Sequence, residues 1–431
     1  MSALLFLRNG RLIDPATGVD AVRSLRIEGG KVAAIEPGDA PAPPGAQVID
    51  CAGRWIVPGL IDLHVHLREP GEEYKETIAT GVRAAVRGGF TAVVAMPNTR
   101  PPIDNAHLVR FVRERGEACG LARVHPAGAV TVGQKGEALA EYGDMKEAGA
   151  VLLTDDGRPV MHAGVMRRAL EYARAFDLPI MVHEEDLHLA AGACMHEGAV
   201  SARLGLKGFP AAAEDVMVLR DVELAALTGG RLHVGHISTA GAVRAVREAR
   251  RRGLRVTAEV TPHHFTLTDE AVAGYDTNAK MCPPLRSAEH VEAVLEGLAD
   301  GTIDAIATDH APHSSLEKDV EFPLAANGVV GLETALPLTL ALVRRGVIDE
   351  RRAVELLSTG PARAIGLPGG RLAVGDVADV TVIDPAAEWT VEPASFESKG
   401  RNTPFAGWKV QGRAELTIVG GAIVYGGERS R

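Results

Sequence analysis

The sequence predicts an α/β protein: a (β/α)8 TIM-like barrel with a small β-sandwich formed by the N- and C-terminal segments. Three observations favour this class. The chain of 431 residues is too long for one ordinary domain, its middle repeats a unit of strand, loop and amphipathic helix, and both ends read as short strands separated by turns. We expect domain boundaries at 1–57 and 368–431 for the two parts of the sandwich and at 58–367 for the barrel.

Eight apolar runs in the middle of the chain fit buried parallel strands. They lie at 61–66, 90–96, 123–130, 150–154, 179–183, 231–236, 255–260 and 303–308. Helical patterns between them include 74–87, 165–176, 215–227, 240–252 and 288–299, several of which end at glycines. A doubly wound open sheet is the alternative, but its first strand usually leads into a Gly-rich phosphate turn. Here histidines occupy that position, which favours the closed barrel.

The two ends of the chain predict β structure of a different kind. Strand candidates lie at 4–7, 24–28, 31–35, 47–50, 379–383, 414–419 and 422–425, with turns such as Asn9-Gly10 and Gly420-Gly421 between them. Neither end is long enough to bury a comfortable core alone. We therefore expect them to pair beside the barrel.

Composition narrows the class of protein. Hydrophobic residues make up 46% of the chain and aromatic residues 4%, which predicts a globular protein with an aliphatic core. The net charge of −10, with no basic block beyond residues 250–252, argues against nucleic-acid binding. Four scattered cysteines predict reduced thiols, and no run approaches the ~20 apolar residues of a membrane span. We expect a cytoplasmic protein with no membrane partner.

Polar residues follow six of the predicted strands, at the end of a β/α barrel where its chemistry takes place. They are His64, His66 and Arg68 after the first strand, Asn98 after the second, Asp155 and Asp156 after the fourth, His183 after the fifth, His236 after the sixth, and Asp309 and His313 after the eighth. Imidazole and carboxylate ligands without thiolates suit Zn²⁺, with Mn²⁺ or Co²⁺ as substitutes. Their number exceeds what one catalytic zinc needs, so we expect two ions that share a bridging ligand. Along the first strand, alternation of side chains places Asp62, His64, His66 and Arg68 on one face. After the fourth strand, alternation does not decide whether Asp155 or Asp156 is the bridge.

Seven segments spread over essentially the whole chain carry a resemblance to a known family. They are H-V-H-L-R-E-P-G at 64–71, A-M-P-N-T at 95–99, T-D-D-G at 154–157, V-H-E-E-D at 182–186, V-G-H-I-S-T at 234–239, A-T-D-H-A-P-H at 307–313 and R-N-T-P-F at 401–405. This pattern resembles the type I dihydroorotases of the amidohydrolase superfamily. H-x-H alone marks only the superfamily, R-E-P-G narrows it to dihydroorotases, allantoinases and hydantoinases, and T-D-D-G narrows it further.

The resemblance implies a role for each site residue. His64, His66 and Asp309 would hold one zinc ion, His183 and His236 the second, and Asp156 would bridge the two. The bridge in many relatives is a carbamylated lysine, but here Lys146 lies on the preceding helix and not on the strand. Asp309 would also act as general base and acid. Substrate contacts are implied for His66, Arg68, Asn98, Cys282, His313, Asn327 and Gly328, with Arg68 and Asn98 gripping a carboxylate. Cys282 departs from the asparagine that is common in the family, and a thiol is a poor replacement for an amide.

The implied function is a dihydroorotase: the reversible, zinc-dependent cyclisation of N-carbamoyl-L-aspartate to L-dihydroorotate and water, the third step of pyrimidine biosynthesis. The small-molecule substrate would be its main partner, in a homodimer that could also bind aspartate transcarbamoylase. The first alternative is another cyclic amidase, a hydantoinase or allantoinase. Such an enzyme should have the bridging lysine and should lack the carboxylate-binding pair formed here by Arg68 and Asn98. The second is an inactive homologue that scaffolds aspartate transcarbamoylase, which should have lost metal ligands. Residues 312–322 are either a mobile lid or a plain surface loop.

Overall fold

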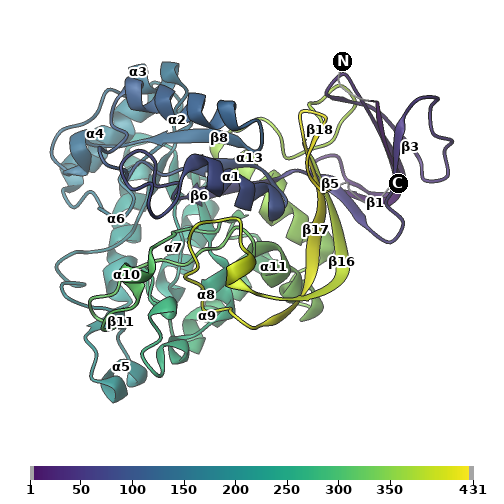
Figure 1. Cartoon of the computed structure of the whole chain (residues 1–431). Coiled ribbons are helices and arrows are strands. Elements are labelled where there is room, and N and C mark those ends of the chain that lie inside the picture. Colours follow the sequence, from purple (N-terminus) through teal and green to yellow (C-terminus); the bar gives the residue numbers. More distant parts are fainter. Residues whose placement is uncertain (1–3, 427–431) are drawn as a thin grey trace.

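The computed structural model describes residues 4–426. Residues 1–3 and 427–431, at the outer ends of the two expected sandwich segments, lie outside the described part. Figure 1 shows a barrel wrapped by helices, with the purple N-terminal and yellow C-terminal strands lying together on one flank. The two ends of the chain therefore meet in space, as expected.

The barrel consists of eight parallel strands in chain order around one sheet. They are β6 (Leu60–Val65), β7 (Phe90–Ala95), β8 (Arg123–Gly128), β9 (Leu152–Thr154), β10 (Ile180–Val182), β13 (Leu232–Val234), β14 (Val256–Val260) and β15 (Ala305–Ile306). The segment after β15 closes the ring against β6, because the N–H of His66 donates to the carbonyl of His310 at 2.9 Å. Each strand overlaps a predicted run, and the barrel is confirmed over the open sheet.

Helices form the outer layer of the barrel, and their ends follow local sequence signals. The Asn105 side chain accepts hydrogen bonds from the first turn of α2 (Ala106–Cys119). Gly120, the residue after this helix, has a left-handed backbone (φ 63°) that ends it. The helices between strands are α1 (Ile78–Arg87), α2 (Ala106–Cys119), α3 (Tyr142–Ala148), α4 (Ala163–Arg174), α6 (Ala212–Thr228), α7 (Ala240–Arg251) and α9 (Ala288–Asp300). After β15 come α11 (Ala335–Arg344), α12 (Glu350–Val354) and α13 (Gly360–Ile365).

The loops that follow the strands carry short elements of their own. Those after β10 contain β11 (Met195–His196), α5 (Ala199–Leu204) and β12 (Gly208–Phe209). The loop after β14 contains α8 (Pro262–Thr266), and the loop after β15 contains α10 (Ser315–Lys318). These insertions lie at the carboxyl ends of the strands, so they surround the mouth of the barrel.

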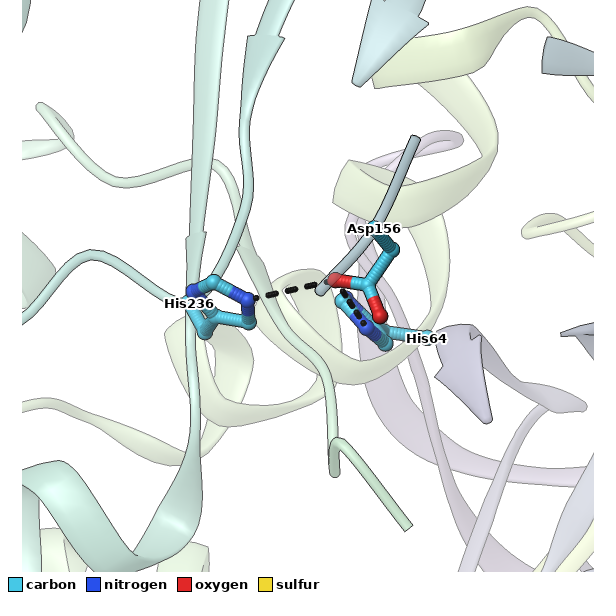
Figure 2. Close-up of side chains that lie close together, drawn as sticks. All are labelled: His64, Asp156 and His236. Carbon is cyan, nitrogen blue, oxygen red and sulfur yellow. Dashed lines mark ion pairs between the residues drawn. The ribbon is translucent and has the colours of Figure 1, made fainter. Parts of the chain in front are cut away.

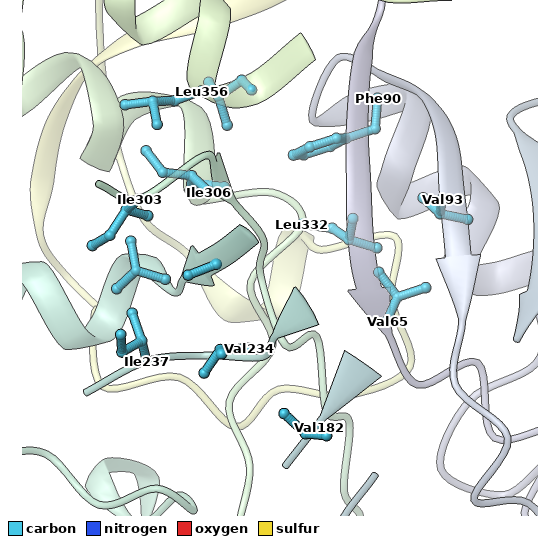
Figure 3. Close-up of a cluster of buried hydrophobic side chains, with 14 of the residues drawn as sticks. Val65, Phe90, Val93, Val182, Val234, Ile237, Ile303, Ile306, Leu332 and Leu356 are labelled. Atoms are coloured by element: carbon cyan, nitrogen blue, oxygen red, sulfur yellow. The ribbon is translucent and has the colours of Figure 1, made fainter. Parts of the chain in front are cut away.

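The main hydrophobic core lies between the barrel strands and the helices. Figure 3 shows part of it, where Val65, Val93, Val182 and Val234 from four strands contribute to one apolar cluster. A second cluster includes the alternate residues Val94, Leu152 and Met181. The alternation of strand side chains between two faces explains this division, and the core is aliphatic, as the composition indicates.

The terminal segments form one curved eight-stranded sheet with its own apolar core. Its strands are β1 (Leu5–Asp14), β2 (Val19–Glu28), β3 (Lys31–Pro37), β4 (Gln47–Asp50), β5 (Trp55–Pro58), β16 (Val380–Thr390), β17 (Lys409–Val419) and β18 (Ala422–Gly426). The sheet curls so that the turn at Gly30 packs against the turn at Gly420 and Gly421. The two halves thus enclose a common core in the manner of a small sandwich.

One local expectation at this end of the chain was wrong. Asn9-Gly10 is a bulge inside β1, with the pairing register shifting between Leu7 and Gly10, and not a turn between strands.

The apolar run that begins at Trp55 spans both sheets, because Gly59 divides it into β5 of the terminal sheet and β6 of the barrel. A side chain at Gly59 would overlap Thr91, with a Cβ only 2.1 Å from its hydroxyl oxygen, so only glycine fits at this division.

None of the helices between residues 4 and 426 combines the length and apolar character needed to cross a membrane. All four cysteines are free, in agreement with the expectation of reduced thiols.

Candidate metal centre and substrate pocket

The six residues predicted as metal ligands converge at the mouth of the barrel, each at or just after the end of a strand. They are His64 and His66 from β6, Asp156 from β9, His183 from β10, His236 from β13 and Asp309 from β15. All six are buried. The approach of side chains from such distant segments is the feature that the prediction required.

Asp156 lies at the centre of this cluster. Its Oδ1 is 3.3 Å from Nε2 of His64, 3.4 Å from Nδ1 of His183 and 3.5 Å from Nε2 of His236, while its Oδ2 is 3.5 Å from Nε2 of His66. Figure 2 shows the imidazoles of His64 and His236 directed at this carboxylate. One carboxylate thus faces nitrogens of all four histidines, the arrangement expected of a bridging ligand.

Asp309 completes one side of the cluster. Its Oδ1 is 3.0 Å from Nε2 of His66 and 3.8 Å from Nε2 of His64. The backbone of Asp309 is left-handed (φ 45°), as is that of His236 (φ 30°). Non-glycine residues rarely adopt such angles, and they concentrate at functional sites where a side chain must be aimed away from the regular strand direction.

The hydrogen bonds of the two β6 histidines fit a cation between the ligands. Nδ1 of His66 contacts the amide oxygen of Asn98 at 2.8 Å, and Nδ1 of His64 contacts Glu259 at 2.9 Å. In neutral rings both Nδ1 atoms carry the hydrogen, which leaves the lone pairs of both Nε2 atoms facing carboxylate oxygens. Acceptors that face each other repel unless positive charge, supplied by a metal ion or by a proton on the ring, lies between them. Nε2 of His64 is indeed buried without a hydrogen-bond partner among the described residues.

Electrostatics support the same conclusion. Burial opposes ionisation of Asp156, but the charge on His64 and hydrogen bonds from the other histidines hold the pKa of Asp156 well below its usual range. The pKa of Asp309 is lowered as well, because His66 and His64 outweigh its burial. Both carboxylates are thus ionised and able to bind metal. Among the described residues, three groups of side-chain atoms lie close enough together to hold an ion: His64–Asp156–His236, His64–His66–Asp309 and His183–Glu185–Cys282. The first two contain only predicted ligands and share His64, and the third joins His183 to two other residues of the cavity wall.

The neighbouring Asp155 does not enter the metal cluster. It accepts hydrogen bonds from the backbone N–H groups of Val130 at 2.8 Å and Thr131 at 3.2 Å. It therefore stabilises the loop after β8. The two adjacent carboxylates, which alternation could not distinguish, are separated by their contacts.

A cavity of about 210 Å³ opens beside the metal cluster. Apart from metal ligands, the residues that line it include all the predicted substrate contacts: Arg68, Asn98, Cys282, His313, Asn327 and Gly328. Arg68 is buried, and its Nε donates to the carbonyl of Pro312 at 3.2 Å. Within residues 4–426 its guanidinium forms no ion pair with a carboxylate. A buried, unpaired cation at the wall of a cavity is suited to an anionic group of a ligand.

Asn98 was expected to contact the substrate carboxylate, but its side chain also contacts two candidate metal ligands. Besides accepting from His66, its amide nitrogen donates to Oδ2 of Asp156 at 3.3 Å. The side chain therefore links two candidate metal ligands while it lines the cavity. Any contact with substrate would share this amide with the metal cluster.

Cys282 also lines this cavity. Its Sγ is 3.4 Å from Oε2 of Glu185 and 3.8 Å from Nε2 of His183. Burial raises the pKa of the Cys282 thiol, so it stays protonated and is not set up as a nucleophile. The adjoining turn is held by His264, whose Nε2 is 3.0 Å from the carbonyl of Pro283.

The segment after His313 is anchored to neighbouring elements. Glu317 of α10 forms an ion pair with Lys75 at 2.9 Å, and Nζ of Lys318 donates to the carbonyl oxygens of Ala326 and Gly328. Of residues 312–322, only His313 lines the cavity. Whether this segment opens as a lid remains a prediction.

Sequence reasoning missed two residues near the site. Glu185 lines the cavity, and Glu259 contacts His64 from β14. The motif around His183 offered a signal for Glu185, but nothing near Glu259 in the sequence indicates a contact with β6. Asp62 accepts from the backbone N–H groups of His64 and Thr308 and is not among the candidate metal ligands.

Comparison with known proteins decides the family. The chain is 64% identical over 427 residues to a protein named dihydroorotase from Anaeromyxobacter sp., which spans 99% of this chain and 98% of the relative. It is 55% identical over 421 residues to a dihydroorotase from Syntrophotalea carbinolica, covering 98% and 99%. The chain belongs to the dihydroorotase family. It is accordingly a cyclic amide hydrolase, and the model of the dihydro-orotase-like family matches residues 53–242.

Solved structures agree on the fold of this dihydroorotase family member. The L-hydantoinase (dihydropyrimidinase) from Arthrobacter aurescens superposes with a TM-score of 0.88 at 26% identity, over 99% of this chain and 96% of that one. A dihydropyrimidinase from Brevibacillus agri gives a TM-score of 0.82 at 24% identity, over 98% and 95%, a level that shows the fold alone. The resemblance to the amidohydrolase superfamily is thus confirmed.

Proposed function

We propose that this protein is a zinc-dependent dihydroorotase that converts N-carbamoyl-L-aspartate reversibly to L-dihydroorotate and water in pyrimidine biosynthesis. The observation that carries the proposal is the buried, unpaired guanidinium of Arg68 beside a cluster of four histidines and two aspartates. Dihydroorotate combines the two groups that this site suits: a ring amide for hydrolysis and a carboxylate for Arg68.

His64, His66, Asp156 and Asp309 would hold one divalent ion, and His183, His236 and Asp156 the other. When bound, such ions polarise an amide carbonyl and lower the pKa of water. Arg68 and Asn98 would orient the substrate carboxylate, while Asp309 accepts a proton from the attacking water and delivers it to the ring nitrogen as the C–N bond breaks. In the reverse direction Asp309 would take the proton from the ureido nitrogen as the C–N bond forms and deliver it to the departing carboxyl oxygen, which leaves as water.

The two alternatives fit the chain less well. A hydantoinase or allantoinase is expected to have a bridging lysine, whereas β9 has Thr154 followed by two aspartates and Asp156 occupies the centre of the cluster. An inactive scaffold for aspartate transcarbamoylase would not need to keep six convergent ligands. A homodimer and a transcarbamoylase complex remain proposals about this protein.

The decisive assay compares the hydrolysis of dihydroorotate, hydantoin and allantoin by one purified sample whose metal content is measured. We expect zinc in the protein and a clear preference for dihydroorotate. A zinc-replete sample that leaves dihydroorotate unchanged would contradict the proposal, and a preference for hydantoin would favour the alternative amidase.

Arg68→Gln is expected to lower kcat/KM for dihydroorotate by roughly 10²- to 10³-fold, because a buried charge pair with the substrate carboxylate is lost. Hydrolysis of dihydrouracil, which has no carboxylate, should fall far less. Steady-state kinetics on both compounds measure the difference. Arg100→Gln, at an arginine that is 78% exposed, is a control with the same change in charge. Equal losses for both compounds would remove Arg68 from carboxylate recognition.

Cys282→Asn is expected to lower the KM for dihydroorotate by up to roughly tenfold, since an amide supplies stronger hydrogen bonds than a thiol. The variant restores the residue that is common in the family at a position on the cavity wall. Cys119→Asn, far along the chain in α2, controls for the loss of a thiol. An unchanged KM would indicate that a backbone group already serves the substrate at this point.

A further inference from the structure

A chain of buried polar side chains runs from His64 into the interior of the barrel. Nδ1 of His64 lies 2.9 Å from Oε1 of Glu259 on β14, and Oε2 of Glu259 lies 3.2 Å from Nε2 of His233 on β13. Nδ1 of His233 in turn lies 2.8 Å from the hydroxyl oxygen of Thr257. Glu259 and His233 are both fully inaccessible to solvent (0% exposed).

The neighbours of these residues show that the polar set faces inward. Leu232 and Val234 on β13, with Val256, Ala258 and Val260 on β14, pack in the main core on the helix side of the sheet. The alternating residues between them therefore point to the inside of the barrel. Burying a carboxylate there is unfavourable unless it is compensated by hydrogen bonds and opposite charge, so its presence calls for a specific role.

We propose that Glu259 is a positioning residue that fixes the tautomer and ring orientation of His64 for metal binding. This inference rests on the proposed role of His64 as a ligand. An ionised carboxylate only accepts hydrogen bonds, so the hydrogen of His64 resides on Nδ1, and Nε2 presents its lone pair to the space shared with Asp156 and Asp309. Nε2 of His233 lies 3.2 Å from the second oxygen of Glu259.

The other candidate ligands have weaker supports of the same kind. Nδ1 of His66 contacts the neutral amide of Asn98, and Nε2 of His183 lies 3.3 Å from Glu185, whose side chain is 17% exposed. Glu259 is both charged and fully buried. Its charge also adds to those of Asp156 and Asp309 around the cation, and partners that orient a ligand in this way raise metal affinity.

The test uses Glu259→Gln, which keeps the shape of the side chain but removes its charge and allows an N–H group to face His64. We expect the zinc dissociation constant, measured by competition with a chromophoric chelator, to rise roughly 10- to 100-fold. NMR of the zinc-loaded wild type should show a low-field, exchange-protected ring N–H for His64, and this signal should be lost or shifted in the variant. Hydrolysis of dihydroorotate should recover substantially at saturating zinc, which would not occur if Glu259 took part in the reaction.

Asp304→Asn is the matched control. Asp304 is a buried carboxylate that accepts from the N–H of Ala258 at 3.0 Å and from Arg250 at 2.8 Å, so it touches the same strand without reaching the site. This variant should lose stability but keep the wild-type zinc affinity. If Glu259→Gln fails to fold, His233→Gln provides a second variant, with an expected weakening of a few-fold.

The possible outcomes separate this inference from the proposed function. Equal zinc affinity in wild type and Glu259→Gln would overturn the inference alone, as would an equal loss of affinity in Asp304→Asn, which would indicate general loosening of the barrel. A wild-type protein that binds no divalent ion would overturn the proposed function and this inference together.

Discussion

Replacing Asp156 with asparagine is expected to remove both metal ions and to reduce dihydroorotate hydrolysis by at least roughly 10³-fold. This carboxylate faces nitrogens of all four histidines within 3.3–3.5 Å, the position that a bridging ligand requires. An amide keeps the shape but carries no charge, and the clustered ligands then lose their central anion. Metal analysis of the dialysed variant, together with the hydrolysis assay, measures the effect.

Asp155→Asn is the control for this experiment. Its carboxylate accepts hydrogen bonds from Val130 and Thr131 and does not face the histidines. It should keep its metal and most of its activity while its free energy of unfolding falls by about 1–3 kcal/mol, the usual effect of leaving buried partners unsatisfied. If Asp155→Asn lost the metal and Asp156→Asn kept it, the assignment of the bridge would be reversed.

Asp309→Asn is expected to lower kcat for dihydroorotate by roughly 10²- to 10⁴-fold, the range for loss of a general acid–base group. Asp309 lies 3.0 Å from His66 and on the cavity wall, a position from which it could exchange a proton with a bound substrate. Because all four histidines and Asp156 remain, we expect the variant to retain at least one metal ion. Steady-state kinetics on samples with measured zinc content separate the loss of proton transfer from the loss of metal.

The same experiment can contradict the assignment in two ways. Unchanged turnover would remove Asp309 from the mechanism. A complete loss of metal, as expected for Asp156→Asn, would show that Asp309 acts mainly as a ligand, so the fall in kcat would no longer report proton transfer.

The sequence was most informative where a pattern is repeated locally. Each barrel strand was found because a buried parallel strand is apolar on both faces, and strand β4 was predicted at its observed bounds, Gln47–Asp50. The prediction of local structure was wrong where a short sequence is compatible with two backbone conformations. Asn9-Gly10 suits a turn and a bulge equally well, and pairing with β2 decides for the bulge.

In the candidate site, too, local sequence predicted some features and missed others. The strand-end rule located His64, Asp156 and Asp309 because a barrel brings the carboxyl ends of all its strands together. It did not find Glu259, because that residue lies within a strand and its contact with the site is to His64, which is 195 positions away along the chain. Nor did it separate Asp155 from Asp156, since an irregular strand end does not keep strict alternation.

By itself, the sequence determined the alternation of strands and helices, the type of residue at each strand end and hence the class of chemistry, because each of these is written within a few consecutive residues. Only the tertiary structure decided which carboxylate lies among the histidines, that Arg68 is buried without an anionic partner among residues 4–426, and that Glu259 contacts His64. These depend on distances between segments far apart in the chain, and such distances are set by barrel closure and packing rather than by local sequence.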